Sequence, residues 1–231
     1  AVPGGGVAVP TGSVEDMDGF ASGDWWVQDL AAMIPSHLLA PQPGDTIVDL
    51  CAAPGGKTLQ LAAAGASVTA VDRSAPRLRL LRENMARTGL KATIVTANAD
   101  EWRPPEPVMK VLLDAPCSAL GTLRRHPEGA WIKREAEVAR FPAAQTRLLD
   151  AAVDMLAPGG TLIYCVCTPL PAEGVDIVEA ALAAGRVQRV PVTPADVPGF
   201  SHAITSSGDV LTRPGGESDH DTFYIARLKK A

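Results

Sequence analysis

Short apolar segments alternate with amphipathic ones along most of this chain, and this alternation limits the fold more than any other feature. Apolar segments bounded by turn residues predict strands, and helical periodicity predicts helices. Strands that alternate with helices form a parallel, doubly wound sheet covered on both faces, so we expect an α/β protein. The expected strands are residues 46–51, 67–73, 92–98, 108–116, 161–167, 187–192 and 222–229, and the expected helices are residues 57–64, 75–88, 135–156 and 173–184.

The seven expected strands do not all run in the same direction. No helix-like segment separates 187–192 from 222–229, so these two strands are expected to be antiparallel neighbours. We therefore predict a mostly parallel, seven-stranded sheet whose last strand is antiparallel. Pro and Gly also predict a turn at 158–160 and a break near Pro142 in the long helix.

The first residues differ in composition from the rest. Residues 1–24 are rich in Gly, Pro and small polar residues, which predicts a linker or the tail of a missing upstream domain. Residues 25–231 are long enough for one substantial core and form the expected functional domain. A helix is expected from Trp25 onward, and its apolar face consists of Val27, Leu30, Ala31, Ile34 and Leu38.

Composition narrows the class of protein. A disulfide framework is not expected in a chain of 231 residues with only four cysteines. Cys165 and Cys167 have the wrong spacing for a zinc site, and none of the four histidines lies near them, so we expect no metal. No apolar run approaches the roughly 20 residues of a membrane span, and no signal peptide is visible. We expect a cytoplasmic monomer with reduced thiols and no membrane partner.

The segment DLCAAPGGKT at 49–58 resembles a phosphate-binding loop, but two positions depart from it. Such a loop needs G-x-x-x-x-G-K-[ST], and the first Gly is replaced here by Cys51. Pro54 also removes one of the backbone N–H groups that would hold phosphate. The dinucleotide fingerprint G-x-G-x-x-G is absent as well. We therefore expect a nucleoside ligand that is not recognised through a phosphate cradle.

Four acidic residues, Asp49, Asp72, Asp100 and Asp114, follow or end four expected strands. Each alone could cap a helix. Together they are expected to lie at the crevice where doubly wound sheets bind ligands, with Asp72 placed to accept hydrogen bonds from ribose hydroxyls. Carboxylates at this crevice, without a phosphate-binding loop, favour a ligand that has ribose hydroxyls and a positive charge. S-adenosylmethionine has both.

Three motifs together resemble one enzyme family. DLCAAPGGKT, DAPCSALGTLRRHP and the Cys167 segment are similar to the RNA cytosine-5 methyltransferases of the rRNA methyltransferase B, Sun and NOP2 family, and the likeness runs from about Gly23 to Lys230. GDWWVQD at 23–29 and the closing FYIARLKK resemble its flanking segments. The resemblance implies a class I, Rossmann-like methyltransferase that uses S-adenosylmethionine. It implies RNA as partner, 16S-type rRNA more than tRNA, and an RNA-binding domain upstream.

Methylation of cytosine at C5 requires covalent catalysis, because that carbon is a poor nucleophile. Cys117 and Cys167 end adjacent expected strands, so their thiols should meet at one edge of the crevice, with Cys165 deeper on the same face. The resemblance implies that Cys167 attacks C6 of the base, that Cys117 helps release the product, and that Asp114 lies near the base and methyl donor. It implies cofactor contacts from Cys51, Ala52, Ala53, Pro54, Gly55, Gly56, Lys57, Asp72, Asp100 and Asp114.

One position departs from the family pattern. Val166 stands where a Thr usually precedes the nucleophile, which either weakens activation of Cys167 or is neutral.

A basic stretch follows the Cys117 segment. By itself it reads as a solvated charged face, but beside the expected site it predicts contacts with RNA phosphates. Trp131 is a candidate for stacking on a base, or it packs inside the protein. The net charge of −5 argues against a free-standing nucleic-acid binder. The expected RNA-binding residues are Arg124, Arg125, His126 and Lys133.

Two other functions remain open at this point. In a DNA cytosine-5 methyltransferase the attacking thiol would be Cys117, which leaves Cys167 without a purpose. In a non-catalytic RNA-binding or ribosome-assembly module the methyltransferase fold would be kept without its chemistry.

Overall fold

A computed structural model describes residues 6–8, 12–215 and 219–231 of the chain. Its centre is one eight-stranded sheet with the order β3-β2-β1-β4-β5-β8-β6, in which β7 also pairs with β8. The pairs from β3 to β5 are parallel, and β8 is antiparallel to both β5 and β6. The strands are β1 (Thr46–Leu50), β2 (Ser67–Asp72), β3 (Thr93–Thr96), β4 (Val108–Asp114), β5 (Leu156–Val166), β6 (Val187–Arg189), β7 (Val210–Leu211) and β8 (Tyr224–Lys230).

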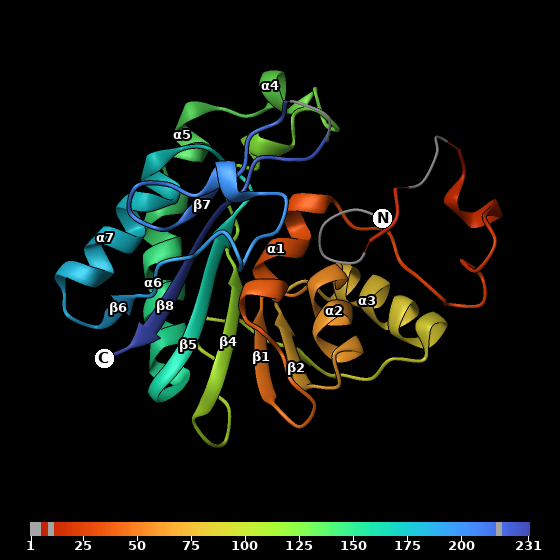
Figure 1. Ribbon diagram of the computed structural model, residues 1–231, viewed down its shortest axis with the longest axis horizontal. Helices are drawn as coiled ribbons and strands as arrows, with labels where there is room; N and C mark the ends of the chain where they lie inside the picture. Colours follow the sequence, from red (N-terminus) through yellow and green to blue (C-terminus); the bar gives the residue numbers. More distant parts are fainter. Residues whose placement is uncertain (1–5, 9–11, 216–218) are drawn as a thin grey trace.

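Helices cover both faces of the sheet, which confirms the doubly wound prediction (Figure 1). One face packs on α6 and α7 through a core that includes Leu149 and Val178. The other packs on α1 and α2 through residues such as Ile34 and Leu61, and α3 joins α2 in a third cluster. The helices are α1 (Leu30–Leu38), α2 (Gly56–Ala63), α3 (Ala75–Thr88), α4 (Gly129–Ile132), α5 (Glu135–Val138), α6 (Phe141–Met155) and α7 (Val175–Ala183).

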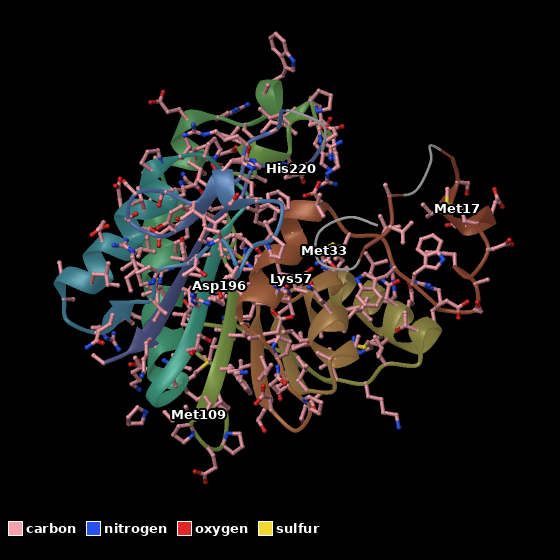
Figure 2. The ribbon with its side chains drawn as sticks, viewed as in Figure 1. Met17, Met33, Lys57, Met109, Asp196 and His220 are labelled. Atoms are coloured by element: carbon pink, nitrogen blue, oxygen red, sulfur yellow. The ribbon has the colours of Figure 1, made fainter. Side chains whose placement is uncertain are left out.

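The sheet changes its direction of winding between β1 and β4. From β1 the chain moves outward to β2 and β3, and it then returns to place β4 on the other side of β1. Ligands of doubly wound proteins bind outside the carboxyl ends of the strands at such a switch point. In Figure 2, His220 lies toward the edge where α4 is found, and Met109, near the start of β4, lies toward the opposite edge.

Three predicted details need correction. The first helix begins at Leu30, because Asp29 caps it by accepting a hydrogen bond from the Ala31 N–H, so Val27 precedes the helix and is exposed. The predicted turn at 158–160 lies inside β5 as an irregularity of its pairing with β4. Strand β7 was not predicted, since two residues carry no readable periodicity.

Other predictions are confirmed. The long helix is interrupted just before Pro142, which stands in the first turn of α6. Helix α3 has the predicted bounds and ends at Gly89 in the left-handed conformation. The last two predicted strands, which became β6 and β8, are antiparallel neighbours.

The described part of the N-terminal segment packs on the domain. The Arg87 guanidinium on α3 donates hydrogen bonds to the Phe20 and Trp25 carbonyls. Gly23 (φ +82°) lies so close to α3 that an added Cβ would be 1.9 Å from the Arg87 carbonyl oxygen. Residues 1–5 and 9–11 of the predicted linker lie outside the described residues, and the domain division stays a prediction. Within the described ranges, no helix has the length and apolar character needed to span a membrane.

Candidate active site

Asp49 is the innermost acid at the switch point. Its side chain is fully buried, and the Thr58 hydroxyl donates a 2.5 Å hydrogen bond to Oδ2. The other oxygen, Oδ1, has no partner among the described residues. Burial raises the pKa of Asp49 to about 7, although the bond from Thr58 works against this, and nearby Asp114 raises the pKa further.

The turn from Cys51 to Lys57 connects β1 to α2 and is held against the end of β2. The Ala53 N–H donates to Asp72 Oδ2 at 3.1 Å, and the Ser74 N–H donates to Asp72 Oδ1 at 2.8 Å. Gly55 (φ +110°) precedes α2, and an added Cβ would lie 2.8 Å from Leu81 Cγ on α3. Asp72 therefore organises this turn, and its carboxylate retains acceptor capacity for a ligand.

Lys57 joins this turn to β4. Its ammonium donates a 2.8 Å hydrogen bond to Asp114 Oδ2 and lies 5.0 Å from the centre of the Phe223 ring. Burial alone would lower the pKa of Lys57, but the Asp114 carboxylate outweighs it and holds the pKa above its usual value. The other carboxylate oxygen of Asp114 accepts a 3.4 Å contact from the Cys165 thiol. A charged pair thus stands at the carboxyl end of β4 (Figure 2 labels Lys57).

The thiols of Cys117 and Cys167 meet, as predicted from the ends of two adjacent parallel strands. Their sulfurs are 3.3 Å apart, and β4 pairs with β5 in parallel so that Asp114 stands opposite Cys165. The hydrogen bond shared with Cys117 lowers the pKa of Cys167, against the effects of burial and Asp114, and Lys57 adds to the lowering. The same bond and burial raise the pKa of the Cys117 thiol. Cys167 is therefore the thiol that more readily becomes a thiolate.

Gly121 holds the loop after Cys117 against the end of β5 by backbone hydrogen bonds. Its N–H donates to the Cys167 carbonyl at 2.9 Å, and its carbonyl accepts from the Thr222 N–H at 2.9 Å. An added Cβ would lie 2.3 Å from the Thr222 carbonyl oxygen and 2.8 Å from that of Cys167. Only glycine allows this close approach.

Cys165 and Val166 lie on opposite faces of the sheet. Cys165 is fully buried in the α1-side core, where Cys167 also packs, so the prediction that Cys165 lies deeper is confirmed. Val166 is fully buried in the core on the α6 side. A hydroxyl at 166 would point into that core rather than along the Cys167 side chain.

The arginines of the basic stretch have acidic partners within the chain. Arg125 binds Asp221 through two nitrogens, with the shortest distance 2.5 Å. Arg124 donates to Asp219 at 2.9 Å and to Asp29 at 3.2 Å. Asp29 and Asp221 are almost wholly buried, so these pairs join the basic loop to the domain. The reading of this stretch as only a solvated charged face is therefore wrong.

The remaining predicted residues lie in three different settings. The Lys133 ammonium donates to the Ser118 carbonyl, beside Cys117, so it is directed inward. The exposed His126 ring lies 3.3 Å from the Glu128 carboxylate. Asp100 lies 3.6 Å from Arg147 on α6. Trp131 is 88 % exposed, which excludes the packing alternative.

Asp29 has a structural role that the sequence interpretation missed. Besides capping α1, its carboxylate accepts hydrogen bonds from the Asp221 N–H and from Arg124. The one signal for it was its place in the GDWWVQD segment, to which no role was assigned.

The chain matches the family model described as 16S rRNA methyltransferase RsmB/F over residues 36–229. The chain belongs to this family. It is 39% identical over 222 residues to the ribosomal RNA small subunit methyltransferase B of Salmonella newport, a match that covers 94% of this chain and 50% of that protein. The chain thus spans about half the length of the curated relatives it matches.

Two solved structures share the fold. NSun6 from Pyrococcus horikoshii, solved with SFG, has a TM-score of 0.82 and 27% identity over 95% of this chain and 56% of that one. A methyltransferase homolog protein from the same organism has a TM-score of 0.79 and 27% identity over 96% and 73%. The predicted family and the Rossmann-like methyltransferase fold are confirmed, and so is S-adenosylmethionine as the cofactor of the family.

The residues at the switch point fit that cofactor. Its ribose needs hydrogen-bond acceptors, and Asp72 supplies a buried carboxylate at the end of β2. Its amino group and sulfonium carry positive charge, and Asp49 Oδ1 is a buried acceptor without a partner among the described residues.

Proposed function

We propose that this domain methylates C5 of a cytosine in small-subunit rRNA through a covalent bond between Cys167 and C6 of the base. The observation that carries the proposal is the 3.3 Å contact between two thiols at the ends of β4 and β5, next to the Lys57–Asp114 pair. S-adenosylmethionine supplies an electrophilic methyl group. The turn 51–57 together with Asp49, Asp72 and Asp100 would hold it.

The two thiols have different tasks in this mechanism. The Cys167 thiolate adds to C6, and the electron pair displaced from the C5–C6 double bond lets C5 bond to the methyl group while the methyl–sulfur bond of the donor breaks and its electrons return to that sulfur. A base then removes the C5 proton, the double bond returns, and the Cys167 thiolate leaves. Cys117 donates a hydrogen bond to the Cys167 sulfur before attack and aids release afterwards. Asp114, fixed by Lys57, would lie against the target base.

The asymmetry of the thiol pair favours Cys167 over Cys117 as the attacking group. In the proposed order Cys117 donates the hydrogen bond between the two sulfurs, which lowers the pKa of Cys167 and raises that of Cys117, and Lys57 lowers the pKa of Cys167 further. A DNA-type mechanism would need the opposite order. The presence of both thiols, the charged pair and the buried acids together also argues against a non-catalytic module.

Small-subunit rRNA is the proposed substrate because the family model and the Salmonella relative are both described by it. The target base must leave its stack to reach a thiol at the end of a strand. Arg124, Arg125 and His126 remain part-exposed around the Cys117 loop and are the proposed phosphate contacts. Lys133 supports the loop from inside, so its effect on RNA would be indirect.

A covalent-trapping gel tests this proposal. Wild type, Cys117→Ala, Cys167→Ala and the control Thr88→Val, which removes a hydroxyl that bonds to the Asn84 carbonyl on α3, are incubated with S-adenosylmethionine and unmodified rRNA or tRNA. We expect Cys117→Ala to accumulate a denaturant-resistant adduct with rRNA, Cys167→Ala to form none, and Thr88→Val to turn over as wild type does. An adduct in Cys167→Ala but not in Cys117→Ala would reverse the roles of the thiols. An adduct with tRNA alone would overturn the proposed substrate.

A further inference from the structure

The residues that directly follow the two cysteines are bonded to each other. The Ser118 hydroxyl donates a 3.0 Å hydrogen bond to the Thr168 hydroxyl oxygen, and both side chains are buried. Thr168 Oγ1 also accepts from the Leu170 N–H at 3.3 Å, which fixes its orientation. Cys117 and Cys167 are thus linked twice, once through their sulfurs and once through their neighbours in the chain.

A buried carboxylate holds the Cys117 side of this link. Glu173 Oε2 accepts from the Ser118 N–H at 2.8 Å and from Gln145 Nε2 at 3.0 Å. The same Gln145 amide donates to the Pro116 carbonyl at 2.9 Å, so the backbone is anchored on both sides of Cys117. Tyr164, from β5, donates through its hydroxyl to the Glu173 carbonyl at 2.6 Å.

The sulfur contact and the hydroxyl bridge close a ring that passes through Cys117, Ser118, Thr168 and Cys167. We infer that Ser118 and Thr168 are positioning residues whose hydroxyl bridge holds the Cys117 and Cys167 sulfurs in contact. The bridge lies out of water, so removing either hydroxyl breaks a buried hydrogen bond and frees the Cys117 loop to shift. The value of this contact for catalysis rests on the function proposed above, but the contact itself can be measured without RNA.

The measurement uses disulfide formation between Cys117 and Cys167 to report their separation. Diamide takes two electrons and two protons from the two thiols and is reduced to the hydrazine. The bridged product is followed by intact mass and located by peptide mapping. Thr168→Val removes the hydroxyl with little change of shape, and Ser118→Ala removes the hydroxyl that bonds to it. Thr168→Ser keeps a hydroxyl at position 168 and removes only the methyl group. Thr88→Val is the matched control, because the Thr88 hydroxyl bonds to the Asn84 carbonyl on α3, away from the thiols.

We expect Ser118→Ala to slow disulfide formation by about tenfold, the effect of one buried hydrogen bond. Thr168→Val should slow it at least as much, because it also removes the acceptor of the Leu170 N–H. The double variant should be no slower than Thr168→Val, because Thr168→Val alone already removes the bond that Ser118→Ala removes. Thr168→Ser and Thr88→Val should oxidise as wild type does. If a variant is too unstable to purify, the remaining single variant and Thr168→Ser still decide the question.

Two results would overturn the inference: wild-type oxidation in both hydroxyl-deleted variants, or equal slowing in Thr88→Val, which would indicate general loosening. The trapping gel with the same variants separates this inference from the proposed function. Slow oxidation of the hydroxyl-deleted variants, with no RNA adduct in any protein, would support the hydroxyl bridge and refute the proposed chemistry. An RNA adduct with unchanged oxidation of these variants would support the proposed chemistry and refute the bridge.

Discussion

Replacing Asp49 by Asn should remove a pH dependence from the stability of the cofactor-free chain. Asp49 is fully buried, and no cation is bonded to it within the described residues; burial raises its pKa from 3.8 to about 7. Between these two values the folded chain keeps a proton that the unfolded chain has released. The stability of the wild type therefore falls as pH rises through this window, and it stays low above it.

The size of the effect follows from the pKa shift. A shift of one unit corresponds to 1.36 kcal/mol, so the full effect is about 4 kcal/mol. Roughly 2–3 kcal/mol of it should be lost between pH 5 and pH 8, because part of the window lies below pH 5. Asn at this position does not titrate and can still accept the bond from Thr58.

Urea unfolding at pH 5 and pH 8 measures this effect as a difference between wild type and variant. We expect Asp49→Asn to gain roughly 2–3 kcal/mol on the wild type as pH rises from 5 to 8. Asp45→Asn is the control: Lys110 lowers the pKa of Asp45, so that acid is ionised in both states over this range. A wild-type-minus-Asp49→Asn difference that stays constant from pH 5 to pH 8 would refute the reasoning.

Three other substitutions give separate tests. Gly121→Ala should lower the free energy of unfolding by about 2–3 kcal/mol and slow adduct formation, because the new Cβ would lie 2.3 Å from the Thr222 carbonyl oxygen. Urea unfolding and the trapping gel check this, and a variant as stable as wild type would contradict it. Val166→Thr should lower stability by about 1–3 kcal/mol without changing the rate of adduct formation, and a faster rate would show that the hydroxyl assists the thiol. Trp131→Ala should leave the Tm unchanged but weaken RNA binding by about 1–3 kcal/mol in a filter-binding assay, and unchanged affinity would remove Trp131 from the RNA surface.

The sequence was sufficient for seven of the eight described strands and for the thiol pair, because both depend on local patterns. Each strand is a short apolar run, and parallel strands bring their carboxyl ends to one edge. Two cysteines placed at the ends of adjacent strands must therefore approach each other, whatever the loops between them do. The sequence also predicted the first and last residues of α3, since Ser74 caps its start and Gly89 follows its end.

The ion pairs of the basic stretch could not be read in this way. Arg124 and Arg125 bind Asp29 and Asp221, which lie 95 and 96 positions away in the chain. No periodicity connects residues so far apart, and a run of basic residues looks the same whether its partners are phosphates or buried carboxylates. Asp29 escaped notice for the same reason, because its carboxylate joins three segments that meet only after folding.

The alternation of β5 explains why one departure from the family pattern is compatible with the proposed chemistry. Tyr164 and Val166 point into the core on the α6 side, whereas Cys165 and Cys167 belong to the other face. The residue at 166 therefore contributes to packing, and the electrostatic surroundings of Cys167 come from Cys117, Asp114 and Lys57. A change from Thr to Val on the core side exchanges a buried hydroxyl for a methyl group, which removes a polar atom from an apolar cluster. The position next to a nucleophile in sequence is thus separated from it in space by the sheet itself.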